Sequence, residues 1–184
     1  MTSPEERSLS LAEWLVLCLV CEESRHGFAI ARLLESDGSM GKVWRVPKPV
    51  VYRALQRLEQ LGLVLTAEQQ PSSQGPVRSL IEATKAGREA AAGWLTRPAE
   101  HTRDVRSELL VKLALLDRAG TDPGPLLEAQ REHLAPVAAA LHDRLAGAEG
   151  FDHTLVLWRY ETITATVRFL DALQARSAGR TPVP

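Results

Sequence analysis

The 184-residue sequence predicts a mainly α-helical protein that carries one small β-hairpin. Three observations lead to this fold class. Apolar residues recur at the i, i+3, i+4 and i+7 spacing of amphipathic helices over most of the chain. One stretch, residues 63–83, changes to short strand-like segments on either side of the turn-forming sequence QPSSQGP. Aromatic residues make up only 5 % of the chain, which favours a helical core of Leu, Val and Ala over a β-sandwich.

The first half of the chain is predicted to contain three helices, a hairpin and a fourth helix. We expect helices at about residues 9–20, 26–36 and 46–62, hairpin strands at 63–69 and 77–83, and a helix that follows Thr84 as its N-cap. The second helix is expected to turn Phe28, Ile30, Leu33 and Leu34 inward. The third begins near Pro47, which is tolerated in a first turn, and turns Val51, Leu55, Leu58 and Gly62 inward. This order of elements is that of a winged helix-turn-helix domain, which we place at residues 1–98.

Residues 99–184 are predicted to be wholly helical and to form a dimerisation and effector-binding region. Helices are expected at about 103–118, 126–146 with a kink at Pro136, and 152–176. The first of them should have Val105, Leu109, Leu113 and Leu116 on one side. In the last helix, apolar side chains alternate by four and three residues, the spacing of a helix–helix seam: Val156, Tyr160, Ile163, Val167 and Leu170. A second copy of the chain and a helix of the same chain are both partners that fit this seam.

A local concentration of positive charge marks the third predicted helix. The whole chain has a formal net charge of −1, so any case for nucleic-acid binding has to be made locally. Five basic residues and no acid lie between Lys42 and Leu58. The predicted DNA-binding residues are those on the outward face of this helix, together with one residue before it and one on the wing: Arg45, Lys48, Tyr52, Arg53, Gln56, Arg57 and Arg78. Arg and Gln can contact base edges in a major groove, whereas Lys and Tyr suit phosphates. The alternative is an ordinary solvated helix surface.

Four segments of the chain resemble the PadR-like transcriptional regulators. They are HGFAIARLLE (26–35), VWRVPKPVVYRALQRLEQLGLV (43–64), GPVRSLIEATKAGR (75–88) and RDVRSELLVKLALL (103–116). The resemblance implies a homodimer joined by its C-terminal helices. It also implies a repressor that binds a palindromic operator in double-stranded DNA and is released by a small molecule. Pro47 and Pro49 depart from the family pattern, so the first turn of the recognition helix is the part that we expect to differ.

No other constellation in the sequence points to chemistry. Cys18 and Cys21 share one helix face but lack the second ligand pair of a zinc site, so we interpret them as packing residues. The histidines are scattered, and no nucleophile motif, phosphate loop or dinucleotide fingerprint is present. The sequence therefore predicts no enzyme, metal or cofactor. The tryptophans (Trp14, Trp44, Trp94 and Trp158) could wall a pocket for a small aromatic or hydrophobic effector, or could simply fill gaps between helices.

The sequence also bears on location and on a competing function. The longest apolar run, Trp14 to Cys21, has eight residues, far fewer than the ~18–20 of a membrane span. The N-terminus lacks the pattern of a signal peptide, so we expect a cytoplasmic protein without membrane contact. Because winged helices also serve as protein–protein interaction modules, the near-neutral net charge keeps that function open as the alternative.

Overall fold

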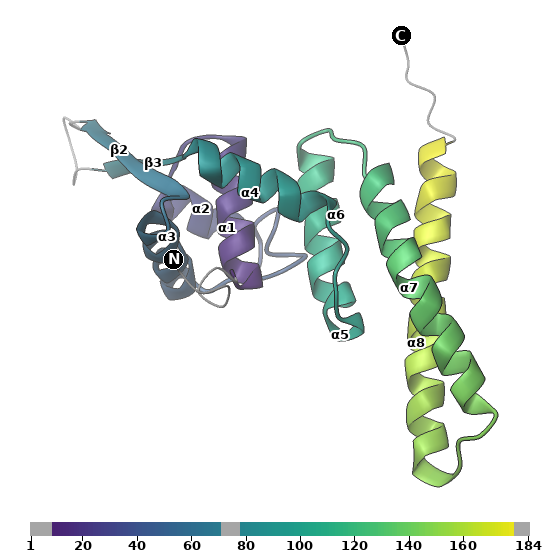
Figure 1. The fold of residues 1–184 in the computed structure, drawn as a ribbon. Coiled ribbons are helices and arrows are strands. Elements are labelled where there is room, and N and C mark those ends of the chain that lie inside the picture. The colour runs from purple at the N-terminus through teal and green to yellow at the C-terminus, as the bar shows by residue number, and fades with distance from the viewer. Residues whose placement is uncertain (1–8, 71–77, 179–184) are drawn as a thin grey trace, which may run out of the picture. The chain divides into compact units, whose positions relative to one another are not determined.

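The computed structural model describes residues 9–70 and 78–178 (Figure 1). The chain divides into two compact units: residues 1–95 with 110–121, and residues 96–109 with 122–184. The first boundary between the units follows residue 95, close to the boundary predicted at residue 98. Residues 110–121, however, belong to the first unit again.

The first unit has the predicted order of helices and hairpin. Its elements are α1 (Leu11–Glu22), β1 (Arg25–His26), α2 (Gly27–Leu33), α3 (Lys48–Gln60), β2 (Val64–Gln70), β3 (Arg78–Ala83), α4 (Lys85–Thr96) and α6 (Leu110–Arg118). The strands form one antiparallel sheet in the order β1-β3-β2, with Val64 opposite Ala83 and Arg25 opposite Ile81. The mainly α-helical winged helix-turn-helix prediction is therefore confirmed, and β1 is a third strand that the sequence did not indicate.

Helix α1 is the centre of this unit. Ser10 is its N-cap: the Ser10 hydroxyl accepts a hydrogen bond from the backbone N–H of Glu13, and the Glu13 carboxylate accepts one from the backbone N–H of Ser10. This reciprocal capping box satisfies two backbone donors that would otherwise lack partners. Every side chain from Leu15 to Val20 is buried, so α1 is apolar on all sides, as expected for a helix inside a core.

Two glycines allow the backbone to take the path it needs around α3. Between α2 and α3 the chain passes so close to itself that a Cβ atom on Gly41 would lie 1.6 Å from the carbonyl oxygen of Glu35. Gly62 has φ +68°, the left-handed conformation that ends a helix, and its surroundings are open. Gly62 is exposed and lies after the end of α3, so its predicted place on the inward face is wrong.

Helix α4 closes the core behind the hairpin. Thr84 is its N-cap, as predicted, and its hydroxyl accepts a hydrogen bond from the N–H of Gly87 at 3.0 Å. Near the other end of α4, the Trp94 ring stacks on the Trp14 ring with 5.3 Å between centroids. The ammonium nitrogen of the fully buried Lys112, on α6, lies 4.6 Å from the Trp94 ring centroid, within the range of a cation–π contact.

The helix predicted at 103–118 changes its winding partway along. It consists of α5 (Thr102–Asp104), the π-helical segment η2 (Val105–Leu109) and α6. A π-turn holds one more residue than an α-turn, so a 3.6-residue period does not continue through it. Val111 and Leu115 are buried with the core of the first unit, whereas Leu113 is only half-buried. Of the four residues predicted on the inward side, Val105, Leu109 and Leu116 are buried, and the prediction is wrong only for Leu113.

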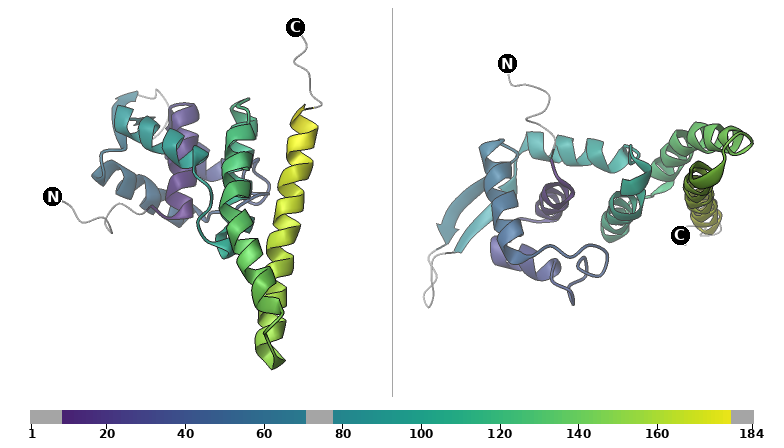
Figure 2. Two further views of the ribbon diagram at one scale, coloured as in Figure 1. Left: turned by 45° about the vertical axis from the view of Figure 1, so that its right-hand side comes forward. Right: turned by 90° about the horizontal axis from the view of Figure 1, so that it is seen from below.

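The second unit contains a long helical hairpin. Helices α7 (Gly124–Leu145) and α8 (Gly150–Ala178) run side by side and are joined by a short turn (Figure 2). Val156, Ile163 and Leu170 are buried in the unit, and α7 continues through Pro136 as a helix. In the described part of the chain, no helix combines the length and apolar character that crossing a membrane would need.

Candidate nucleic-acid interface

Helix α3 has one buried and one exposed face, as predicted. Val51 and Leu58 have no exposed surface, and Ala54 and Leu55 are also buried in the core of the first unit. These four side chains lie within one 100° sector of the helix, because successive residues are rotated by 100°. The opposite sector is therefore the one that a partner molecule can reach.

The exposed sector carries the predicted groove-facing side chains. All of the predicted residues on α3 are exposed: Lys48, Tyr52, Arg53, Gln56 and Arg57. Of these residues, Arg53 and Gln56 lie nearest the middle of the sector, beside Pro49 and Gln60, and Tyr52 and Arg57 lie on its two sides. The one carboxylate of α3, Glu59, is exposed beside Tyr52 at the edge of the sector and accepts a hydrogen bond from the Thr66 hydroxyl at 2.7 Å. The geometry offers guanidinium and amide donors at the centre of a positive surface.

Phe28 extends this surface and was not predicted to do so. It is 53 % exposed instead of inward-facing, so its predicted place in the core is wrong. The ammonium nitrogen of Lys48 lies 5.0 Å from the Phe28 ring centroid, a cation–π contact that holds the lysine at the start of α3. Helix α2 is only seven residues long, too short for its periodicity to fix which face is inward.

The two prolines at the start of α3 leave an ordinary helical first turn. Pro47 is the N-cap residue, and its carbonyl oxygen accepts hydrogen bonds from the N–H groups of Val50 and Val51 at 2.8 and 3.2 Å. Pro49 has no N–H, but a backbone donor at this position would have no partner within the helix. The departure from the family pattern therefore costs the helix no hydrogen bond.

A hydrogen bond joins the sheet to the start of helix α2, and two arginines lie near α3 and on the sheet. The Nδ1 atom of His26 donates to the carbonyl oxygen of Ser79 at 3.1 Å, which joins the start of α2 to β3. Arg45 is exposed in the connection before α3, and Arg78 is the first residue of β3. The Arg78 side chain and residues 71–77 lie outside the described residues, so their role at the wing stays a prediction.

The cysteines and two of the tryptophans belong to the core of the first unit. Cys18 is buried, and its burial raises the pKa of the thiol far above the ordinary value; burial also raises the pKa of Cys21. A thiol with a raised pKa stays protonated and unreactive, which supports the packing interpretation. Trp14 and Trp94 are occupied by their mutual stacking. Trp44 is 37 % exposed and Trp158 is 70 % exposed.

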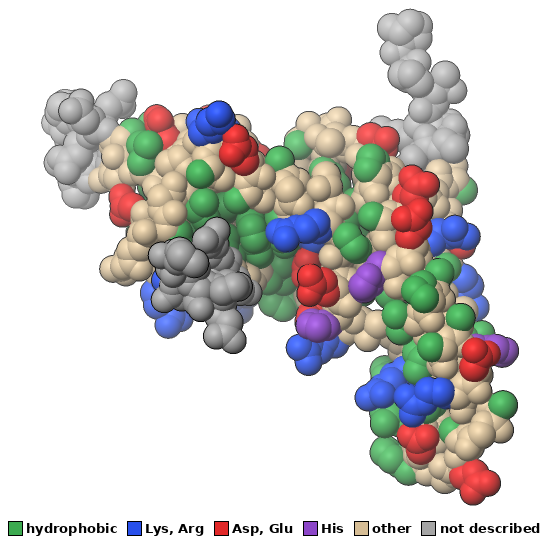
Figure 3. Space-filling view, viewed as in Figure 1, with side chains coloured by type: hydrophobic (Ala, Val, Ile, Leu, Met, Phe, Trp, Pro, Cys, Tyr) green, Lys and Arg blue, Asp and Glu red, His purple; other side chains and the backbone are tan. Residues whose placement is uncertain are grey.

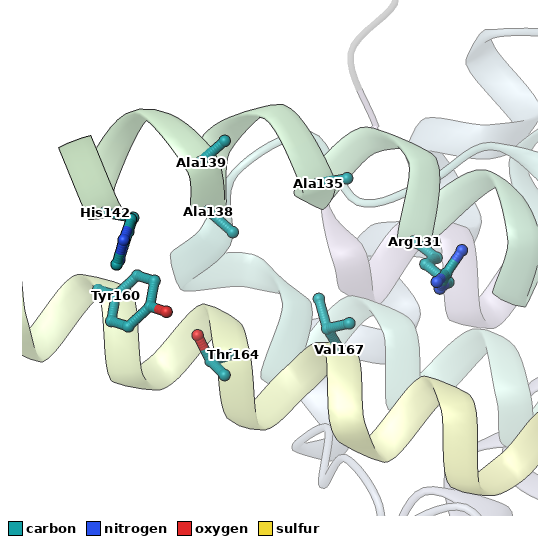
Figure 4. A pocket seen from close by; sticks show the side chains of 8 residues that line it. All are labelled: Arg131, Ala135, Ala138, Ala139, His142, Tyr160, Thr164 and Val167. Carbon is teal, nitrogen blue, oxygen red and sulfur yellow. The ribbon is translucent and has the colours of Figure 1, made fainter.

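The predicted seam on α8 is divided between the interior of the unit and its surface. Val156, Ile163 and Leu170 are buried, so within this chain they have the intramolecular partner that the sequence left open. Tyr160 and Val167 line an open groove of about 400 Å³ between α7 and α8 (Figure 4). The remaining lining residues are Arg131, Ala135, Ala138, Ala139, His142 and Thr164. The His142 and Tyr160 rings meet at one end of this groove, 5.5 Å apart.

Comparison with known proteins identifies the winged-helix part of the chain. Residues 16–93 match the model of the "Transcriptional regulator PadR-like family". No curated protein matches the chain.

Three of the solved structures that are similar to this chain come from Bacillus species. Bacillus subtilis PadR in complex with operator DNA is 17 % identical, with a TM-score of 0.47 over 91 % of this chain and 99 % of that one. Bacillus subtilis PadR in complex with p-coumaric acid is 15 % identical, with a TM-score of 0.43 over 91 % and 98 %. The PadR-like transcriptional regulator BC1756 from Bacillus cereus is 18 % identical, with a TM-score of 0.41 over 95 % and 99 %.

The match begins within α1 and ends within α4, and therefore contains all of α3 and both strands of the hairpin. The winged helix-turn-helix part of this chain is therefore similar, over residues 16–93, to the PadR-like family of transcriptional regulators.

Proposed function

We propose that the protein is a homodimeric transcriptional repressor that inserts α3 into the major groove of a palindromic operator. The observation that carries this proposal is the exposed sector of α3, where Arg53 and Gln56 lie near the centre of a basic surface opposite a fully packed face, and the one acid of the helix, Glu59, lies at the edge. Helices enter a major groove with one such face, and two copies would read half-sites about one helical turn apart. Release by a small molecule and a cytoplasmic location are parts of the same proposal.

A DNA titration tests this function. The full-length protein is titrated with the promoter DNA of its own gene and with random duplex of equal length, at several salt concentrations. A repressor should prefer the promoter by roughly 10³-fold or more at physiological salt, with an affinity that falls as salt rises. Equal affinity for both duplexes would contradict the proposal. Binding to neither would favour the alternative, a winged-helix module that binds an acidic protein.

We propose that dimerisation uses the groove between α7 and α8, because Tyr160 and Val167 are the two seam residues that a second copy can still reach. Small alanine side chains on α7 line the same groove and let another helix approach closely. A helix of the partner inserted here would cover its apolar lining, which is otherwise in contact with water (Figure 4).

Replacing an exposed alanine of this groove with a charged residue tests the proposed dimer interface. Ala139→Glu places a carboxylate in the groove and is expected to convert the dimer to monomer in sedimentation velocity, because burying an unpaired charge is costly. Ala140→Glu is the matched control, since Ala140 is also exposed on α7 but does not line the groove. A dimer that survives Ala139→Glu unchanged would place the interface elsewhere.

A further inference from the structure

Two exposed aromatic rings lie where α2 meets α3. Phe28, on α2, is 53 % exposed, and Tyr52, on α3, is 45 % exposed. Hydrophobic side chains reach the surface in both units (Figure 3), but Phe28 has the largest exposed fraction of the large hydrophobic side chains in the described part of the first unit. An apolar ring in contact with water is stabilised when a partner molecule covers it.

The backbone that carries Phe28 is fixed by two other elements of the unit. His26, two residues earlier, belongs to β1, which pairs with β3, and its Nδ1 atom lies 3.1 Å from the carbonyl oxygen of Ser79. Gly27 packs against α3, since a Cβ atom built on it would lie 3.1 Å from a ring carbon of Tyr52. Because this backbone is already ordered, a contact between the Phe28 ring and a partner has a low entropic cost.

The Phe28 ring also lies beside the residue to which we assign a phosphate contact. Lys48 is the first residue of α3, and its ammonium nitrogen lies over the Phe28 ring, 5.0 Å from the centroid. A phosphate bound by Lys48 would bring the ring to the edge of the major groove, next to one DNA strand. The C5 methyl group of thymine is the apolar group that unmodified base pairs present in this groove.

From this arrangement we infer that Phe28 reads a thymine in each half-site of the operator, by packing its ring against the C5 methyl group. Phenylalanine is one of the side chains suited to this contact. The inference rests on the proposed function, because it adds a base-reading residue on α2 to those on α3. Lys48 lies five residues before Arg53 and eight before Gln56, so the thymine should lie roughly two to four base pairs from the bases that those side chains contact.

Operator duplexes that contain deoxyuridine test the contact without altering the protein. Deoxyuridine pairs as thymidine does and lacks only the methyl group. Synthetic promoter duplexes, which contain no 5-methylcytosine, carry deoxyuridine at one symmetric pair of thymidine positions at a time, and fluorescence anisotropy gives the affinity of the full-length protein. At one such pair the affinity should fall about fifteenfold, or about fourfold for each half-site, which corresponds to ~0.8 kcal/mol for one buried methyl group. Unchanged affinity at every pair would overturn the inference.

Variants of Phe28 assign the effect to this ring. Phe28→Ala should bind the thymidine and deoxyuridine duplexes with equal affinity. Loss of the ring also removes the cation–π partner of Lys48, which weakens binding to both duplexes alike, so the ratio of the two affinities is the quantity to compare. Phe28→Leu keeps an apolar side chain and should retain a preference for thymidine of at least about twofold for each half-site.

Leu65→Ala is the matched control, because Leu65 is also apolar and is 44 % exposed, but lies on β2. This variant should retain the full preference for the thymidine duplex. A Phe28→Ala variant that retained the same preference would overturn the inference, since another residue would then contact the methyl group.

The same duplexes separate this inference from the repressor function. Preference for the unmodified promoter over random duplex, without any loss of affinity on deoxyuridine substitution, would support the repressor and overturn the thymine contact. Equal affinity for the unmodified promoter and random duplex would contradict both.

Discussion

Replacing Arg53 and Gln56 together with alanine is expected to lower the affinity for operator DNA by about a hundredfold or more. The two side chains lie three residues apart, at the centre of the exposed sector of α3. A good bidentate contact to a base edge contributes roughly 1–3 kcal/mol of discrimination, so the loss of two should also reduce the preference for operator over random duplex. Fluorescence anisotropy titrations with both duplexes measure these two quantities.

Variants of other exposed basic residues provide the comparison. Arg88→Ala, on α4, removes one charge from the same unit away from α3 and should change operator affinity little. Lys48→Ala should weaken binding to both duplexes equally and lower the salt-dependence slope by about 0.9, as expected for one lost phosphate contact. If Arg53→Ala/Gln56→Ala bound operator as wild type does, the face of α3 assigned to the groove would be wrong.

Both faces of α3 could be predicted because the helix is 13 residues long and amphipathic. Over three turns, the 3.6-residue period leaves only one way to bury Val51, Leu55 and Leu58 together. The N-cap at Thr84 was also predictable, since a hydroxyl side chain at this position satisfies one of the first backbone donors of a helix. The features that local chemistry determines were therefore visible in the sequence.

Features that depend on distant parts of the chain could not be predicted. Strand β1 has two residues and exists because it pairs with β3, more than 50 positions away. The π-turn η2 breaks the helical period between Leu109 and Val111, although each half looks like ordinary helix. For the seam on α8, the sequence showed that Val156, Ile163 and Leu170 need a partner, but α7 and a second copy would satisfy the same pattern.

The tryptophans show the same limit. The sequence indicated four tryptophans that could contact an effector but gave no means of choosing among them. The choice depends on tertiary packing: Trp14 and Trp94 stack on each other, whereas Trp158 faces water beside Arg159. Residues 100–103, which line one hollow together with Trp158, lie about 55 positions earlier in the chain, and no local pattern connects them to α8.

Gly87→Ala is expected to destabilise the winged-helix unit by about 2–3 kcal/mol, as measured by urea or thermal unfolding. A Cβ atom at this position would lie 2.0 Å from the carbonyl oxygen of Leu63 and 3.3 Å from a methyl carbon of Leu17. Backbone cannot yield as a flexible side-chain end can, so α4 would have to move away from the start of the hairpin. The melting temperature should fall by at least about 8 °C, since 1 kcal/mol corresponds to roughly 4–8 °C in a domain of about 100 residues.

Gly93→Ala on the same helix is the matched control, and its effect should have the opposite sign. Nothing lies within 4 Å of a Cβ atom built at Gly93, so the substitution adds only helix propensity, worth up to about 1 kcal/mol. Equal changes in the free energy of unfolding for the two substitutions would mean that helix propensity alone determines the stability change. They would also mean that α4 does not pack closely on the turn at Leu63. Opposite effects would show that this backbone contact fixes α4 against the hairpin.

The Thr84 hydroxyl donates to the carbonyl oxygen of Gly62 at the same junction, at 2.8 Å, so a displaced α4 would also disturb the end of α3. The Gly87→Ala variant should therefore bind DNA more weakly even under conditions in which it is folded, whereas Gly93→Ala should retain wild-type DNA affinity.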